Sequence, residues 1–405
     1  MAQSTKHKAH IIILKKGKSE ALRRFHPWIF SGAIATMDKD IIEGDIVHIA
    51  TEQGKIVATG FYSDASIAVR ILSFSETVID TDFWNEKLKS AFQARQAMGL
   101  VDNTSTNCYR LIHAEGDGLS GLIVDFYNGV AVVQCHAVGM HRMMHFITAA
   151  LKNILQHRLI AGYDKSHETL PLNYVAENKI QNGYIFGDVI TPHICSENGN
   201  SFAIDWITGQ KTGFFLDQRD NRATLTHYVR DKKVLNAFCY SGGFSVYALK
   251  AGASKVCSVD ISPKAIDLTH QNIKLQNDDT FESKHSAIVT DAIPFLKEHE
   301  QMYDVVIVDP PAFAKSVSKR HNAVQAYKRL NEMALRRIVC GGILFTFSCS
   351  QVVDRQLFYD TIVAAAIEAK RNVRVLQQLT QGADHPVNIF HPEGSYLKGL
   401  VLYVE

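Results

Sequence analysis

Residues 233–262 have the sequence KVLNAFCYSGGFSVYALKAGASKVCSVDIS, which predicts a strand, a tight turn, a helix and a second strand. Val234-Leu235 begins the first strand, and Gly242-Gly243 lets the backbone approach a ligand because glycine has no Cβ. Helical spacing follows over Phe244–Ala251, and Asp260 ends the second strand. In an open parallel sheet, ligands bind at the carboxyl ends of the strands, where a carboxylate can accept both hydroxyls of a ribose.

The turn favours S-adenosylmethionine over a nicotinamide dinucleotide. The dinucleotide fingerprint is G-x-G-x-x-G, whereas this turn has only the adjacent pair Gly242-Gly243. A pyrophosphate needs close approach to the helix amino terminus, and a cofactor without phosphate tolerates Cys239-Tyr240-Ser241 there. An ordinary βαβ unit whose strand ends in an acidic residue is the simplest alternative.

The sequence from Glu197 to Glu405 alternates between predicted strands and helices, which indicates a parallel sheet. Ser262-Pro263 has the pattern of an N-cap followed by proline at the first helical position. The carboxyl ends of parallel strands meet at one edge, so polar residues there should form one site. These residues are Asn236, Ser241, Asp260, Asp291, Asp309-Pro310-Pro311 and Cys349. Any single one has a simpler explanation; Asp291, for example, could only cap the following helix.

The remaining elements predicted in this half complete the sheet. They are a helix over 324–338 that Gly341-Gly342 closes, a strand over 343–347, a helix over 354–369, and an antiparallel pair with strands near Asn388 and over 399–404. Asp309-Pro310-Pro311 stiffens the backbone as it leaves its strand, and this geometry can hold a carboxylate against a planar base. Amino-methylating enzymes place an aromatic directly after such prolines, whereas here Ala312 precedes Phe313.

Cys349 suits methyl transfer to carbon 5 of a pyrimidine. That carbon is not nucleophilic enough to take a methyl group from a sulfonium. A thiolate that adds to carbon 6 makes the ring an enamine, and later loss of the carbon-5 proton expels the thiol. The thiol must be activated by its surroundings. Asp309 could hydrogen-bond the cytosine edge and help protonate N3, and Cys239 is interpreted as a packing residue.

Composition describes a globular protein of two or three domains. The chain has 405 residues, 46% of them hydrophobic, and a formal charge of +2, so any nucleic-acid surface must be local. The longest early apolar run, Ile11–Leu14, is too short for a signal core or a membrane span. The seven cysteines show no C-x-x-C pair and no metal-ligand spacing with His, which predicts a cytoplasmic protein with reduced thiols and no metal.

The first 195 residues predict two smaller parts. Residues 1–75 read as a β-domain with strands over 11–14, 45–49, 55–59 and 67–71. Its stretch Arg23–Gly32 interleaves bases with aromatics, which suits phosphate contact and base stacking as well as it suits a hydrophobic plug with a basic edge. Residues 76–195 read as an α+β domain, with helices over 83–98 and 141–155 around strands over 109–113, 121–125 and 130–135.

Over nearly its whole length the chain resembles the RlmI-type class I methyltransferases, which make 5-methylcytidine in bacterial large-subunit ribosomal RNA. The stretches that carry the resemblance are Arg24–Gly32, Tyr109–Asp125, Lys211–Arg222, Asn236–Phe244, Asp309–Phe313, Phe347–Ser350, Asp384–Val387 and Pro392–Gly399. The resemblance implies an RNA-binding PUA domain over 1–75, a central EEHEAD-like domain over 76–195, and a Rossmann-like methyltransferase domain over 196–405 with a seven-stranded, mostly parallel sheet and an antiparallel edge hairpin. Some relatives assemble as homodimers.

The resemblance also implies site residues. It implies Cys349 as the nucleophile, and the reasoning from the residues adds Asp309 as the expected partner in catalysis. The residues expected around S-adenosylmethionine, and its product S-adenosylhomocysteine, are Phe215, Asp217, Gln218, Asn236, Phe238, Tyr240, Ser241, Gly242, Asp260, Ile261, Asp291, Ala292 and Asp309. The residues expected to contact 23S ribosomal RNA are Arg24, Trp28, Phe30, Lys315, Lys319 and Arg320, although the last three suit a solvated loop equally well.

The sequence leaves other functions open. A guanine-N methyltransferase of ribosomal RNA with a similar D-P-P-x-F loop needs no covalent cysteine, so a Cys349→Ala variant would keep its activity. An RNA-binding assembly factor would bind S-adenosylmethionine without transferring its methyl group. A nicotinamide oxidoreductase is the most distant alternative.

Overall fold

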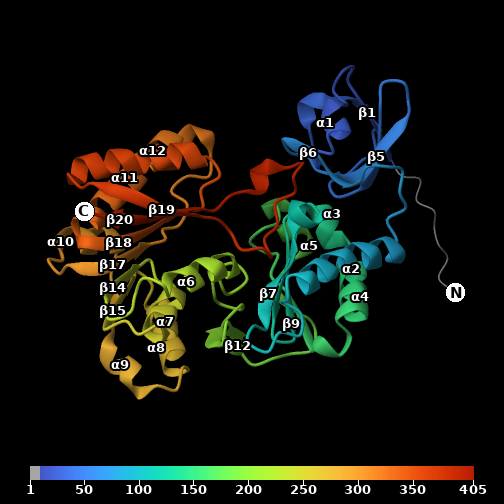
Figure 1. The fold of residues 1–405 in the computed structure, drawn as a ribbon. Coiled ribbons are helices and arrows are strands. Elements are labelled where there is room, and N and C mark those ends of the chain that lie inside the picture. The colour runs from blue at the N-terminus through green and yellow to red at the C-terminus, as the bar shows by residue number, and fades with distance from the viewer. Residues whose placement is uncertain (1–9) are drawn as a thin grey trace. The chain divides into compact units, whose positions relative to one another are not determined.

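The computed structural model describes residues 10–405, so residues 1–9 of the predicted first domain lie outside the described residues. The chain divides into two compact units. Unit 1 comprises residues up to His193 together with Asp205–Gly213 and Ala383–Gly394, and unit 2 comprises Ile194–Ile204, Phe214–Gly382 and Ser395–Glu405. Figure 1 shows the elements of each unit along the chain.

Unit 1 begins with a six-stranded sheet in the order β2-β6-β5-β4-β1-β3. Its elements are β1 (His10–Leu14), α1 (Glu20–Arg23), β2 (Trp28–Phe30), β3 (Ile34–Met37), β4 (Ile46–Ala50), β5 (Ile56–Tyr62) and β6 (Ile67–Ser73). The strands predicted over 11–14, 45–49, 55–59 and 67–71 are confirmed as β1, β4, β5 and β6. Alternate β-branched side chains such as Ile12, Val47 and Val69 are fully buried and form the core of this sheet.

The rest of unit 1 is built on a five-stranded sheet in the order β11-β10-β9-β8-β7. The strands are β7 (Cys108–His113), β8 (Leu122–Tyr127), β9 (Val130–Cys135), β10 (Ala161–Asp164) and β11 (Gly183–Phe186), and the helices are α2 (Thr81–Ala97), α3 (Val138–Arg142), α4 (Met144–Leu155) and α5 (Leu172–Asn178). The helix predicted over 83–98 is confirmed as α2. The single helix predicted over 141–155 is wrong, because Met143, with φ −90° and ψ 9°, interrupts it between α3 and α4.

Unit 2 contains a seven-stranded sheet in the order β16-β15-β14-β17-β18-β20-β19. Its strands are β14 (Lys233–Ala237), β15 (Lys255–Asp260), β16 (His285–Val289), β17 (Tyr303–Val308), β18 (Ile338–Ser348), β19 (Val373–Leu379) and β20 (Lys398–Val404). The five strands β14 to β18 pair in parallel, and β20 pairs antiparallel with both β18 and β19. The predicted fold class, a mostly parallel sheet with an antiparallel edge hairpin, is confirmed.

Helices of unit 2 pack against this sheet through side chains such as Leu235, Val306 and Leu344, which are fully buried. They are α6 (Arg219–Leu225), α7 (Gly243–Lys250), α8 (Pro263–Lys274), α9 (Asp279–Lys284), α10 (Ala292–Glu298), α11 (Arg320–Arg336) and α12 (Arg355–Ala369). A short antiparallel pair, β12 (His193–Glu197) and β13 (Asn200–Ile204), precedes them. Ser262 caps α8 by accepting a hydrogen bond from the backbone N–H of Ala265, as the S-P pattern predicts.

Two expectations about the end of the sheet are wrong. Gly341-Gly342 does not close the preceding helix, which ends at Arg336; both glycines lie inside β18, at an irregular stretch where a Cβ on Gly342 would meet the backbone oxygen of Asp304. The strand expected near Asn388 is also absent. The partner of β20 is β19, and Asn388 belongs to the loop segment Ala383–Gly394, which is part of unit 1. Among residues 10–405, no helix is long and apolar enough to cross a membrane.

Candidate active site

Five neighbouring parallel strands bring the predicted polar residues to one edge of the sheet. The order β16-β15-β14-β17-β18 places the carboxyl ends of these strands side by side. Asp291 follows β16, Asp260 ends β15, the turn up to Gly242 follows β14, Asp309 follows β17, and Cys349 follows β18. The predicted clustering along one edge is therefore confirmed, and the edge has the position of a ligand site in this class of sheet.

The turn between β14 and α7 has an unusual backbone that its neighbours hold in place. Phe238, Tyr240 and Gly242 all have positive φ, at 61°, 47° and 76°. A Cβ on Gly242 would approach the Thr269 side chain to 2.6 Å, so this position requires glycine. The Asn272 side chain donates a hydrogen bond to the Ser241 carbonyl oxygen at 2.8 Å. Non-glycine residues in this conformation cost free energy, and such strain concentrates at ligand sites.

Two of the predicted cofactor residues in this region have buried side chains. Asn236 is buried within β14, and its side-chain amide donates to Ser245 at 2.9 Å. Ser241 is also buried. Cys239 packs beneath the turn, and burial raises the pKa of its thiol, so it remains protonated. This environment agrees with the interpretation of Cys239 as a packing residue.

Both oxygens of the Asp260 carboxylate are held by hydrogen bonds from the backbone. Its Oδ2 accepts a hydrogen bond from the backbone N–H of Tyr240 at 2.9 Å, and its Oδ1 accepts one from Ser262 at 3.0 Å. Each carboxylate oxygen has a second lone pair, which leaves room for a ribose hydroxyl. The next residue, Ile261, exposes 70% of its surface and offers an apolar wall for a planar base.

Asp291 and Ala292 lie at the amino end of α10. The Asp291 side chain accepts a hydrogen bond from the backbone N–H of Ile293 at 2.9 Å, so it is an N-cap, as the simpler interpretation predicts. Ala292 is buried directly behind it. A cofactor contact at this position therefore remains a prediction.

The segment Phe215–Gln218 is held against the edge by a buried ion pair. Arg222 makes two hydrogen bonds to Glu197, at 2.8 and 2.7 Å, and a third to the carbonyl oxygen of Phe215 at 3.0 Å. The Phe215 ring lies 5.2 Å from that of Tyr240. Asp217 accepts from the Tyr396 hydroxyl at 2.6 Å through Oδ2, whereas its buried Oδ1 has no hydrogen-bond partner in the described part of the chain.

These residues fit S-adenosylmethionine. A buried carboxylate oxygen without a hydrogen-bond donor costs free energy. The ammonium group of the methionine moiety is a donor that would satisfy the unpartnered oxygen of Asp217. Asp260 offers acceptors for ribose hydroxyls, and the exposed Ile261 offers an apolar contact for adenine. The donor set thus matches an ammonium, a diol and an aromatic ring.

Asp309 has an environment that favours its protonated form. It is half-buried at the end of β17, and Gln218 donates a hydrogen bond to its Oδ2 at 2.9 Å. Burial, followed by the nearby charge of Asp217, raises the pKa of Asp309 to about 7. At neutral pH this carboxyl can therefore both donate and accept a proton.

Cys349 follows the strand next to that of Asp309, and Lys398, which pairs with Ser348 in the sheet, is close enough to influence its thiol. Burial, together with the charges of Asp309 and Asp217, raises the pKa of the Cys349 thiol to about 11, and Lys398 opposes that shift. Lys398 is buried, and it donates a hydrogen bond to the carbonyl oxygen of Ser350 at 2.6 Å. Burial lowers the pKa of Lys398 to about 8. The site thus contains a thiol, a carboxyl and an amine whose pKa values are all shifted.

Sequence reasoning did not single out Lys398, although it lies in the quoted stretch Pro392–Gly399. The β18–β20 register pairs Ser348 with Lys398, and this antiparallel pairing brings the amine beside Cys349. A charged residue at the start of an otherwise apolar final strand was the signal available in the sequence.

The loop after Asp309 carries the predicted basic residues. Ser350 donates a hydrogen bond to the carbonyl oxygen of Ala314 at 2.8 Å, which ties this loop to the end of β18. Beyond Ala314, the side chains of Lys315, Lys319 and Arg320 are exposed. They are accessible to a phosphate backbone, and their role in RNA binding remains a prediction.

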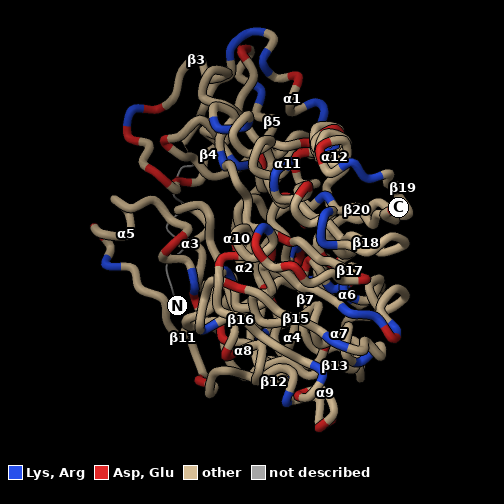
Figure 2. Tube along the Cα trace, turned by 90° about the vertical axis from the view of Figure 1, so that its left-hand side faces the viewer, with Lys and Arg blue, Asp and Glu red and all other residues tan. Residues whose placement is uncertain are grey.

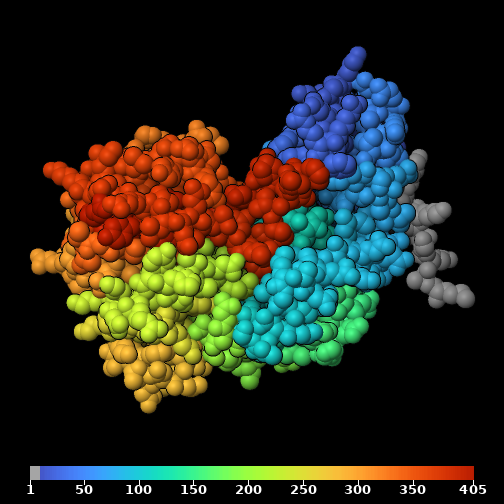
Figure 3. Space-filling model, viewed as in Figure 1, coloured from blue at the N-terminus to red at the C-terminus, as the bar shows by residue number. Residues whose placement is uncertain are grey.

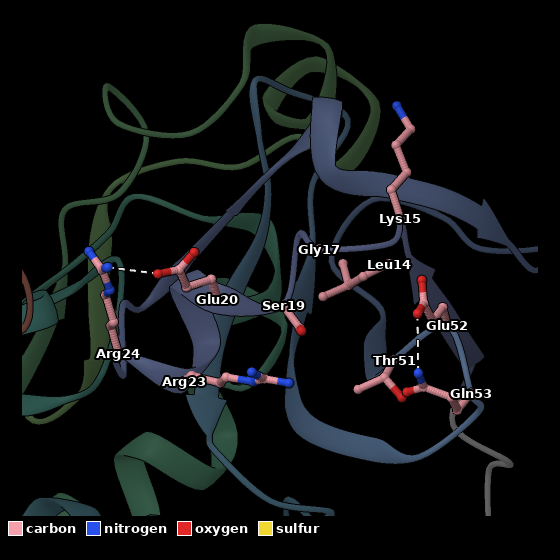
Figure 4. A pocket seen from close by; sticks show the side chains of 10 residues that line it. All are labelled: Leu14, Lys15, Gly17, Ser19, Glu20, Arg23, Arg24, Thr51, Glu52 and Gln53. Carbon is pink, nitrogen blue, oxygen red and sulfur yellow. Dashed lines mark hydrogen bonds and ion pairs between the residues drawn. The ribbon is translucent and has the colours of Figure 1, made fainter.

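The other predicted RNA contacts lie in unit 1. Phe30 is 52% exposed, whereas the Trp28 indole N–H donates a hydrogen bond to Glu115 at 2.9 Å. Arg24 is exposed and pairs with Glu20 at 2.7 Å. Figure 4 shows the pocket to which Arg24 belongs. The pocket is lined by Leu14, Lys15, Gly17, Ser19, Glu20, Arg23, Arg24, Thr51, Glu52 and Gln53. Basic and acidic residues are interspersed along both units (Figure 2), so positive charge is only local.

Comparisons with known proteins agree with this arrangement. The PUA-like domain family matches residues 12–74, and the S-adenosylmethionine-dependent methyltransferase family matches residues 109–386. Ribosomal RNA large subunit methyltransferase I of Aeromonas hydrophila is 39% identical over 96% of this chain and 98% of its own. The protein of the same name from Shewanella frigidimarina is 37% identical over 97% and 99%. A solved structure of a provisionally assigned methyltransferase, complexed with SAH, superposes with a TM-score of 0.83 at 20% identity and covers 97% of this chain and 99% of its own.

Proposed function

This chain belongs to the ribosomal RNA large subunit methyltransferase I family, and we propose that it forms 5-methylcytidine in 23S ribosomal RNA through a covalent adduct at Cys349. Its methyl donor is S-adenosylmethionine. The observation that carries the proposal is the position of Cys349. Five of the seven cysteines are buried and Cys340 is exposed, whereas Cys349 is partly exposed at the ligand edge, beside Asp309.

The residues of the edge have separate tasks in holding the cofactor. Asp260 binds the ribose hydroxyls, Ile261 contacts the adenine, and Asp217 accepts from the methionine ammonium group. Bound S-adenosylmethionine supplies the methyl group as an electrophile on a sulfonium. Glu197 and Arg222 fix the backbone of Phe215 and so keep Asp217 at the edge.

Cys349 begins the chemistry on the base. Its thiolate forms a bond to carbon 6 of the cytosine, and the electron pair of the ring double bond makes carbon 5 nucleophilic. Carbon 5 takes the methyl group, after which loss of the carbon-5 proton restores the double bond and expels the thiolate. The ring returns to aromaticity with one methyl group added and one proton lost.

Asp309 supplies a proton to N3 while the thiolate adds. A carboxyl whose pKa is about 7 is partly protonated at neutral pH, so it can donate to N3 during addition and accept the proton again on elimination. Lys398 assists Cys349, because a cation beside a thiol favours the thiolate. The exposed Lys315, Lys319 and Arg320 bind the RNA backbone, and the PUA-like domain with Arg24 and Phe30 binds a second part of the RNA.

The test is a trapping experiment with 5-fluorocytidine. Large-subunit RNA that contains this base is incubated with the protein and S-adenosylmethionine, both as free RNA and as a partly assembled particle. Fluorine at carbon 5 blocks the final elimination, so the adduct should accumulate and appear in the intact-protein mass. We expect the adduct in the wild type and in Cys340→Ala, a control in the strand β18 that precedes Cys349, and none in Cys349→Ala.

Turnover on ordinary RNA gives the second readout. Cys349→Ala should lower the methylation rate at least about 10⁴-fold, as removal of a nucleophile does elsewhere, while binding of S-adenosylmethionine persists. Methyl transfer without any adduct would contradict the cytosine-5 mechanism and favour a guanine-N reaction. Cofactor binding without transfer to either form of the substrate would favour an assembly factor.

A further inference from the structure

Three metal-binding side chains meet in unit 1. His26 precedes β2, whereas His391 and Glu393 lie in the loop segment Ala383–Gly394. One ligand atom from each residue lies within 4.8 Å of the others. His26 Nε2 is 3.6 Å from Glu393 Oε1, and His391 Nε2 is 3.8 Å from Glu393 Oε2. Figures 1 and 3 show this C-terminal segment, in red, against the blue N-terminal part of the chain.

These separations are too long for hydrogen bonds and suit a shared ion. A heavy-atom distance of 3.6 Å lies beyond the range of a normal N–H···O bond. Ligands at about 2.0–2.1 Å from a tetrahedral Zn²⁺ lie roughly 3.3 Å from one another. The two His–Glu distances exceed that value by a few tenths of an ångström, which small side-chain rotations remove.

The environment of His391 independently indicates that this side chain binds a ligand. It is only 3% exposed, yet neither of its ring nitrogens has a hydrogen-bond partner in the described part of the chain. Its imidazole packs against Trp28, with ring centroids 4.4 Å apart. A buried imidazole without any partner is costly, and it faces the His26 ring at a centroid distance of 5.5 Å.

The Nδ1 atom of His26 contacts the backbone of Trp28 in two ways: it lies 3.3 Å from the carbonyl oxygen and 3.2 Å from the backbone nitrogen. The tautomer with its proton on Nδ1 donates to the carbonyl oxygen and leaves the lone pair of Nε2 free for a metal, so metal binding selects this tautomer over the one that accepts from the N–H. Arg70, whose guanidinium lies 5.8 Å from the centre of the Trp28 ring, pairs with Glu115 at 3.3 Å, which limits its repulsion of a bound metal.

We propose that His26, His391 and Glu393 bind a divalent transition metal, Zn²⁺ in the first instance, through two imidazole nitrogens and the carboxylate of Glu393. This donor set suits Zn²⁺ and leaves a fourth position for water. The metal would fasten the segment Ala383–Gly394, which interrupts the chain between β19 and β20, to the strand that begins at Trp28. No local motif indicates the site, because the sequence separates its first and last ligands by most of the chain.

The test is metal binding by the full chain after treatment with EDTA. Titration with zinc chloride, followed by calorimetry and elemental analysis, should give one equivalent bound to the wild type. Glu393→Gln should bind at least about tenfold more weakly. Because Glu393 is half exposed, this variant will fold, whereas His391→Ala changes a buried residue and needs a check of folding. The matched control is Glu168→Gln, which removes an exposed His167–Glu168 pair at a similar 3.7 Å.

Cobalt(II) distinguishes this site from the thiols. Bound Co²⁺ should show visible d–d absorption without the near-ultraviolet charge-transfer band that a thiolate ligand such as Cys340 would add. It should also quench the fluorescence of Trp28, so Trp28→Phe should lose most of the quenching. Equal binding by the wild type and Glu393→Gln, a thiolate band, or no stoichiometric binding would overturn the proposal. None of these readouts depends on methyl transfer.

Discussion

Unit 2 contains two groups of buried charge that differ in how completely they are paired. Glu197 is fully buried, and both of its oxygens accept hydrogen bonds from Arg222, with another from the Tyr247 hydroxyl. At the sheet edge, Asp217 has an oxygen without a partner in the described chain, and Asp309 has a pKa raised to about 7. The carboxylate of Glu197 finds its hydrogen-bond partners within the protein, whereas the carboxyl groups at the sheet edge lack partners that a ligand would supply.

The difference follows from what burial does to a charge. A buried ion pair whose hydrogen bonds are all made holds its neighbours in one arrangement, and removing one partner leaves an uncompensated charge. A buried group without a full set of partners instead shifts its pKa, and this is how a site acquires groups that exchange protons near neutral pH. We therefore expect changes in the first group to lower stability and changes in the second to lower the rate.

Breaking the paired group should give the largest effect. Arg222→Met removes both hydrogen bonds that Arg222 makes to the buried Glu197 and leaves the ion pair with Arg219, whose Nε lies 3.7 Å from the carboxylate, so the free energy of unfolding should fall by about 3–5 kcal/mol. Urea unfolding measures this change. The control is Arg336→Met, which removes the exposed pair with Glu332 and should cost less than about 1 kcal/mol. Equal losses in the two variants would contradict a structural role for the Glu197 pair.

Changing the carboxyl at the edge should lower the rate and leave the fold intact. Asp309→Asn keeps the shape and a donor to N3 but cannot transfer a proton, so the methylation rate should fall about 10²-fold. Because the donor is the protonated carboxyl, the ratio of the wild-type rate to the variant rate should decline as pH rises through about 7; this ratio removes the ionisation of Cys349, which both proteins share.

Asp309→Asn, although it should be slower, should be more stable than the wild type at alkaline pH. The folded-state pKa of Asp309 lies above the unfolded value of about 4, so the wild type loses stability relative to the unfolded chain as pH rises from about 4 to about 7. Above pH 7, Asp309→Asn should therefore melt at a higher temperature than the wild type. A lower melting temperature for Asp309→Asn at pH 8 would show that the carboxylate is structural.

The same contrast explains which features could be predicted from the sequence. Asp260, Asp309 and Cys349 each follow a short β-branched or apolar run, and parallel strands bring such ends together whatever the rest of the chain does. This local pattern, a polar residue directly after an apolar run, was sufficient to predict which residues lie at the sheet edge. Another local pattern failed at Gly341-Gly342, where a glycine pair resembles a helix end but forms an irregular stretch of strand next to the backbone of Asp304.

Pairs that form over long separations left no such signal. Glu197 and Arg222 meet only because β12 returns to α6, and Lys398 reaches the site only because β20 runs antiparallel to β18. The segment around Asn388 was predicted as the strand that pairs with β20, but β20 pairs with β19. Which strand pairs with β20 depends on the packing of the whole sheet. Registers of this kind are set by packing, which a local pattern does not contain.

The smallest effect should come from Lys398, and its pH dependence identifies its role. A cation beside Cys349 favours the thiolate, so Lys398→Met should slow both methylation and the reaction of Cys349 with iodoacetamide about tenfold at pH 7. Lys398 has a pKa of about 8, so its charge is present below pH 8 and is lost above it. The ratio of wild-type to variant rates should therefore be largest below pH 8 and fall towards one as pH rises.

Two further variants separate charge from packing at this position. Lys398→Arg keeps its charge at alkaline pH, so its alkylation rate should not converge with that of Lys398→Met. Lys274→Met, at an exposed lysine of α8, should leave the rate unchanged. A ratio that stays constant from pH 6 to pH 10 would mean that Lys398 supports Cys349 only by packing and by its hydrogen bond to Ser350, because neither contribution titrates with the amine.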